Sequence, residues 1–74
     1  MSYFLEIDIP NKNQESMRDM ARQLMVNVKN IKVVHIIRDD HDLLAEVEGS
    51  NPKEVIQEIK SKVKEIEYIQ PLHI

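Results

Sequence analysis

The sequence contains no cysteine, no tryptophan and a single glycine in 74 residues. Without cysteine the chain cannot form disulfides, thiolate zinc sites or iron–sulfur clusters, and it has no cysteine nucleophile. One glycine, Gly49, is too few for the glycine-rich loops that cradle phosphates. A chain of this length buries only about 60% of its unfolded surface. Small domains often need further stabilisation, and self-association is the means that this composition favours.

Charge of one sign and long apolar runs are missing as well. The net charge is -3, with acidic and basic residues interspersed, so we expect no basic surface for nucleic acid or for an anionic membrane. No apolar run approaches the roughly 20 residues that span a bilayer. Glu6 and Asp8 interrupt the early apolar segment, which excludes the pattern of a signal peptide. We therefore expect a cytoplasmic protein without nucleic-acid or membrane partners.

Hydrophobic periodicity predicts one domain over residues 1–74. Residues 3–9 alternate apolar and polar side chains, as a half-buried strand does. Apolar residues then recur at steps of three and four, which predicts a helix from an N-cap at Asn13 to about Lys29. Residues 31–38 are rich in β-branched side chains and predict a second strand.

The second half of the chain repeats the order strand, helix, strand. Residues 39–42 are polar and predict a turn, and residues 43–48 predict a third strand. Asn51 followed by proline and Glu54 is typical of a helix start. This helix has a predicted buried stripe and an exposed Glu58–Lys62 pair; the stripe consists of Ile56, Ile59, Val63 and Ile66. Residues 69–74 predict a short last strand, in which Pro71 suits an edge position or a bulge rather than a central strand.

This order predicts an α+β, ferredoxin-like βαββαβ fold. Right-handed crossovers put both helices on one face of a four-stranded antiparallel sheet, so the other face has no cover from the chain itself. We expect apolar side chains on that uncovered face at Phe4, Val34, Ile36 and Leu44. Because exposed apolar patches usually mark interfaces, these residues predict a twofold dimer packed through the sheet, in the manner of a dimeric α/β barrel.

Histidines and aspartates are the candidates for metal or catalytic chemistry. A transition-metal site needs converging ligands, but the second and fourth strands should be opposite edges, which separates His35 from His73. The aspartates around His41 are typical of a solvated turn. We therefore predict no metal site, no cofactor and no catalytic residue. A metal bridged between subunits by His35, His41 or His73 is the weaker alternative.

Three short segments in residues 31–74 form a pattern: His41-Asp42-Leu43-Leu44 at the turn, Ala45-Glu46-Val47-Glu48 after it, and Ile66-Glu67-Tyr68-Ile69 before the last strand. This pattern resembles the effector-binding module, or RAM domain, of the Lrp/AsnC family of prokaryotic transcription regulators. The likeness implies a stand-alone, non-enzymatic, effector-sensing module that lacks the DNA-binding helices. It also implies sheet-to-sheet dimers, higher oligomers and a full-length family regulator as a partner.

The resemblance further implies an effector, typically an amino acid, that binds near the turn between the second and third strands. Carried over to this chain, that site consists of Asp39, Asp40, His41 and Asp42. Two other functions stay open. The first is an amino-acid-binding module of the ACT type, whose ligand loop would be residues 10–13. The second is a small dimeric α/β-barrel enzyme, in which His35 would be the candidate in the pocket.

Overall fold

The protein is described by a computed structural model over residues 1–10, 13–37 and 42–72. The elements follow one another as strand, helix, strand, strand, helix, strand, as the sequence predicts. Their bounds are β1 Ser2–Asp8, α1 Gln14–Asn27, β2 Ile31–Ile37, β3 Asp42–Glu48, α2 Pro52–Lys62 and β4 Tyr68–Pro71.

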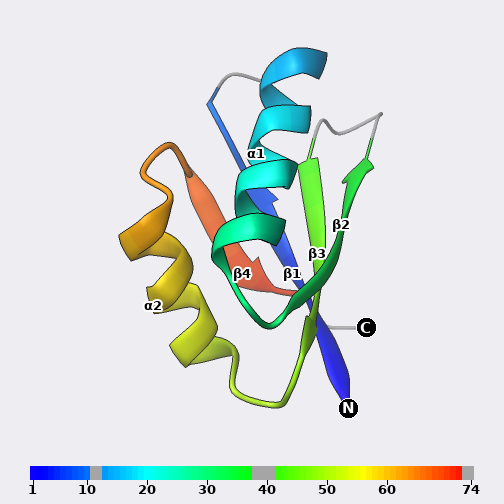
Figure 1. Ribbon diagram of the computed structural model, residues 1–74, viewed down its shortest axis with the longest axis vertical. Coiled ribbons are helices and arrows are strands. Elements are labelled where there is room, and N and C mark those ends of the chain that lie inside the picture. Colours follow the sequence, from blue (N-terminus) through cyan, green and yellow to red (C-terminus); the bar gives the residue numbers. More distant parts are fainter. Residues whose placement is uncertain (11–12, 38–41, 73–74) are drawn as a thin grey trace.

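The four strands form one sheet in the order β2-β3-β1-β4, and every neighbouring pair is antiparallel. Both helices lie on the same side of this sheet (Figure 1). The arrangement is α+β and consistent with a ferredoxin-like fold, so the predicted class and element order are confirmed; the predicted dimer through the sheet stays a prediction. The predicted edge position of the last strand is also confirmed, because β4 pairs with β1 alone among the described strands.

The hydrophobic core fills the space between the sheet and the helices. Leu5 and Ile7 of β1 are fully buried, and Glu6 between them is not, as the alternation of a half-buried strand requires. Apolar side chains make up the whole buried class of the described residues. On α2 the buried residues are Val55 and Ile59, whereas Ile56 is only partly buried. The helix is therefore rotated slightly from the stripe that the sequence predicts.

Local hydrogen bonds begin both helices where the sequence places them. Asn13 Oδ1 accepts the Ser16 backbone N–H at 2.8 Å. At α2, Asn51 Oδ1 accepts the Glu54 N–H at 3.5 Å, and Asn51 Nδ2 donates to Glu54 Oε2 at 3.1 Å. Pro52 occupies the first turn, where a missing N–H costs little. The described helices are not long and apolar enough to cross a bilayer.

Lys62, the last residue of α2, also contacts the end of α1. Its Nζ is 2.9 Å from Glu58 Oε2, so the predicted pair of α2 is present. The same ammonium donates to the Asn27 carbonyl at the end of α1, also at 2.9 Å. A helix C-terminus carries unpaired carbonyls and a partial negative charge, so the ammonium satisfies an acceptor that α1 leaves free.

An irregularity in β2 changes which of its side chains face the helices. The register shifts within residues 31–33, and such a bulge moves the following side chains to the opposite face. Val34 lies opposite Ala45, and Ile36 lies opposite Leu43. Both partners are fully buried, and residues directly opposite point to the same face. The expectation that Val34 and Ile36 lie on the uncovered face is therefore wrong.

Candidate functional site

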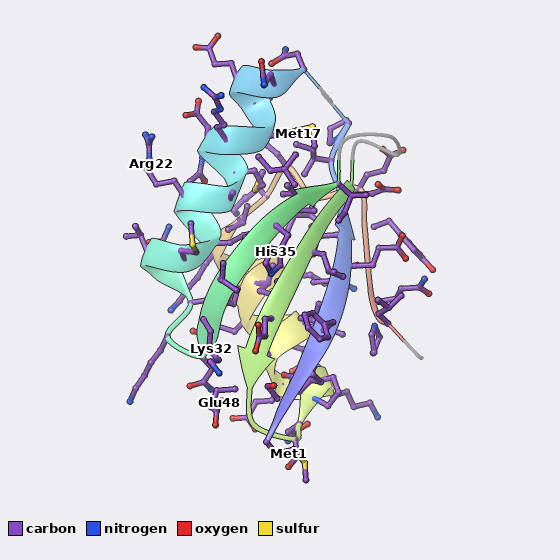
Figure 2. The ribbon with its side chains drawn as sticks, turned by 90° about the vertical axis from the view of Figure 1, so that its right-hand side faces the viewer. Met1, Met17, Arg22, Lys32, His35 and Glu48 are labelled. Atoms are coloured by element: carbon purple, nitrogen blue, oxygen red, sulfur yellow. The ribbon has the colours of Figure 1, made fainter. Side chains whose placement is uncertain are left out.

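The side of the sheet away from the helices has no cover from the described chain (Figure 1). Its members follow from the alternation of β1 and β3 and from the pairing of their neighbours. We call it the outer face, and its residues are Ser2, Phe4, Glu6, Asp8, Lys32, Val33, His35, Ile37, Leu44, Glu46, Glu48, Tyr68 and Gln70. In Figure 2, α2 lies behind the sheet and His35 projects from β2 toward the viewer.

An apolar band bends around Glu46 on the outer face. Phe4 and Val33 both pair with Glu46, while Leu44 pairs with Glu6 in β1 and with His35 in β2. Phe4, Leu44 and Val33 are therefore diagonal neighbours on three adjacent strands, at about 7–8 Å, within reach of aromatic and long side chains. All three are partly exposed. Phe4 and Leu44 thus lie on the face where the sequence predicts them, and Val33 takes the place of Val34.

The charged groups beside this band have partners within the chain. Lys32 Nζ lies 3.6 Å from Glu46 Oε2 and 3.6 Å from Glu48 Oε2. Lys32 and Glu48 are labelled at the lower end of the sheet in Figure 2. Gln70 Nε2 donates to Glu6 Oε1 at 3.0 Å. These carboxylates would therefore keep a counter-charge or a hydrogen-bond donor if a partner molecule covered the face. Burying a charge is most costly when it has no such partner.

The predicted effector site lies mostly outside the described residues: Asp39, Asp40 and His41. Asp42 is the first residue of β3, and its side chain is likewise outside them. The site stays a prediction. His35 lies on β2, at the edge of the sheet opposite β4, and His73 falls outside the described part. Within that part, no three or more histidine, aspartate or glutamate side chains form a group that could hold a metal ion.

A small hollow that the sequence did not suggest lies where β3 leads into α2. It has a volume of about 130 Å³ and is lined by Tyr3, Gly49, Asn51 and Glu54, among others. The Tyr3 hydroxyl donates to the Asn51 carbonyl at 3.4 Å. Partial burial, and then the nearby Glu54 carboxylate, raise the pKa of Tyr3 above its ordinary value of 10.0. Gly49 has φ at 118°, a region of backbone conformation that is open mainly to glycine. The glycine itself is therefore the local sequence signal for this turn.

The acidic lining of the hollow limits what it could hold. Glu48, Glu54 and Glu58 all contribute to it, so it favours water or a small cation over an anion. The outer face, which is larger and combines an apolar band with paired charges, is the stronger candidate for a functional surface.

Comparison with known proteins adds no name to this surface. No protein-family model matches the chain, and no curated protein matches it in sequence. The likeness to the Lrp/AsnC module therefore rests on the three short motifs in residues 31–74, and it stays a prediction.

Proposed function

We propose that this protein is a non-enzymatic regulatory module that acts by self-assembly through its outer face and senses a small effector. One observation carries the assembly part of the proposal. Phe4, Leu44 and Val33 form an apolar band over three adjacent strands, on a side of the sheet that neither helix covers. Leaving such a band in water is unfavourable by about 25 cal/mol for each Å² that could be buried.

A second copy of the chain is the partner that best fits this face. A twofold axis brings the same patch of each subunit together, so an apolar band meets an apolar band. A standard interface buries about 800 Å² on each partner, which is roughly a sixth of the 5065 Å² that the chain exposes. One broad side of a molecule of this size supplies that area. The intrachain partners of Glu6 and Glu46 reduce the cost of covering the face.

The sensing part of the proposal rests on the Lrp/AsnC resemblance. That resemblance assigns an amino-acid effector to Asp39, Asp40, His41 and Asp42, between the second and third strands. A ligand bound there would act on the contacts between dimers rather than on a reaction. A full-length regulator of the same family is the protein partner that the resemblance implies.

The assembly is tested by measuring the mass of the protein in solution. We expect sedimentation equilibrium to give a dimer or a larger assembly at micromolar concentration. Leu44→Lys introduces two uncompensated charges into a twofold interface, and we expect it to weaken association by about a hundredfold or more. Gln57→Lys adds the same charge on the exposed side of α2 and should leave the mass unchanged.

Two results would contradict this proposal separately. A monomeric wild-type protein at high micromolar concentration refutes self-assembly. If the protein assembles but none of the common amino acids changes its mass or its thermal stability, the effector part fails and the assembly part stands. Far-ultraviolet circular dichroism of Leu44→Lys and of a second variant, Phe4→Lys, shows whether each variant is still folded. A folded variant with a lower assembly mass has lost association and not its structure.

A further inference from the structure

The free edge of β2 is a second uncovered feature, distinct from the outer face. β2 pairs with β3 on one side, and no described strand pairs with its other side. It is seven residues long, whereas the opposite edge, β4, has four residues and ends at Pro71. An edge strand presents unpaired N–H and C=O groups that can pair with another chain. The longer, proline-free edge is the better template.

The usual protection of an edge strand is absent from most of β2. Charged side chains, particularly lysine, normally discourage pairing at an edge. The regular part of β2, Val33–Ile37, carries none, although 31% of the whole chain is charged. Lys32 is the single charged residue of the strand; it lies within the irregular segment, and its ammonium is held by Glu46 and Glu48 on the outer face.

Exposed apolar side chains occur on β2 and on the helix that packs against it. Ile36 and Ile37 are each 36% exposed, and on α1 Met25 is 43% and Val26 is 76% exposed. α1 packs against β2 and lies alongside it in Figure 2. These residues make up most of the large apolar side chains that the described chain exposes. A strand that paired with β2 would cover part of the exposed surface of Ile36 and Ile37.

We propose that β2 pairs antiparallel with β2 of a second copy, about a twofold axis at His35. The irregularity ends the regular ladder at Val33 and the strand ends at Ile37, so His35 is the middle of the regular part. In this register Val33 lies opposite the partner's Ile37, and Val34 lies opposite the partner's Ile36. Every pair except the central histidines is then aliphatic, and such pairs stabilise a sheet.

The register centred on Val34 is less favourable than the one centred on His35. An axis at Val34 would place Lys32 opposite the partner's Ile36, which would separate the lysine from its carboxylates or leave a charge against an aliphatic side chain. The pairing at His35 leaves Lys32 and its partners outside the new ladder. It joins two sheets edge to edge. Val33, His35 and Ile37 then pair at the rim of the outer face, but Phe4 and Leu44 take no part, so the edge pairing does not require the outer faces to pack together.

Cross-linking tests the pairing directly, because the chain has no cysteine of its own. Cα atoms directly opposite in an antiparallel pair are about 4.5–5.5 Å apart, within the range of about 4.4–6.8 Å that a disulfide allows. We expect His35→Cys to form a covalent dimer under mild oxidation about tenfold faster, or more, than Leu72→Cys. Leu72 follows the opposite edge strand and is similarly exposed, at 39%.

The two assembly surfaces are separated by repeating the reaction with Leu44→Lys in both cysteine variants. The edge pairing predicts that, in that background, His35→Cys still forms the covalent dimer faster than Leu72→Cys. Equal rates would mean that the outer faces, and not the edges, brought the cysteines together, and would overturn the edge pairing. Adding Ile36→Lys should slow the His35→Cys reaction about tenfold, since it places a lysine at two positions of the ladder. This comparison is made both with Leu44 and with Leu44→Lys. If Ile36→Lys leaves the rate of His35→Cys cross-linking unchanged, the edge pairing is overturned as well.

Discussion

Two neighbouring valines of β2 give a sharp test of the register. Adjacent residues of a strand point to opposite faces, and the irregularity at residues 31–33 decides which of the two valines faces the core. Val34 packs against the core, and Val33 lies opposite Glu46 on the outer face. Replacing each valine by threonine keeps the β-branched shape and the strand preference. The only change is a hydroxyl group in place of a methyl group, so the two substitutions differ in environment and not in chemistry.

The expected costs differ because only one hydroxyl enters the core side. Burying a hydroxyl without a hydrogen-bond partner costs about 1–3 kcal/mol in proteins, and Val34 is only partly buried, so we expect Val34→Thr to cost about 1–2 kcal/mol. Val33→Thr should stay within about 0.5 kcal/mol, as surface substitutions do. In a domain of this size about 1 kcal/mol lowers Tm by roughly 4–8 °C, which predicts a fall of roughly 4–16 °C for Val34→Thr and of less than about 4 °C for Val33→Thr.

The assay is urea and thermal unfolding followed by far-ultraviolet circular dichroism. The protein should be dilute enough to be monomeric by sedimentation, because association through the outer face would stabilise the folded state and add to the apparent cost at Val33. Equal costs, or a larger cost for Val33→Thr, would refute the bulged register. Strict alternation along the strand, as the sequence first suggests, would then be correct.

Two further predictions concern the turn between β3 and α2. Gly49→Ala should lower the free energy of unfolding by about 1–3 kcal/mol. The cost comes from backbone strain alone, because φ is 118° and no atom lies within 4 Å of an added Cβ. Urea unfolding with Ser50→Ala as the control checks this, and an unchanged stability would show that Gly49 does not have this conformation. The raised pKa of Tyr3 means that its contribution to stability is complete below pH 10.0, the ordinary tyrosine value, and is lost as pH rises through the higher pKa of the folded state. Tyr3→Phe should therefore lose less stability than the wild type on raising the pH into that range, and identical alkaline profiles in urea unfolding would contradict the shift.

Features that depend on near neighbours in the chain were predictable. Asn13 and Asn51 begin the two helices because each side chain accepts an N–H three residues later. The alternation of residues 3–9 shows one buried face because its other face carries Glu6 and Asp8. These interactions form within a few residues, so the residue types at those positions are sufficient to place them.

The second strand shows where prediction from sequence fails. Residues 31–38 carry aliphatic side chains on both alternating faces, so periodicity could not reveal a shift within residues 31–33. The consequence is limited but specific: Val33 and Ile37 join the outer face in place of Val34 and Ile36. Phe4 and Leu44 were placed correctly, because the strands that carry them alternate clearly.

The sequence by itself determined the element order, the α+β class, the helix starts and the absence of all cysteine chemistry. These follow from composition and from interactions a few residues long. Only the tertiary structure decided which faces of β2 are covered, that Tyr3 meets Asn51 across 48 positions of the chain, and that the longer free edge of the sheet belongs to β2. Those features depend on which strands pair and in what register. Strand register is fixed by the packing of the whole core, to which every element contributes.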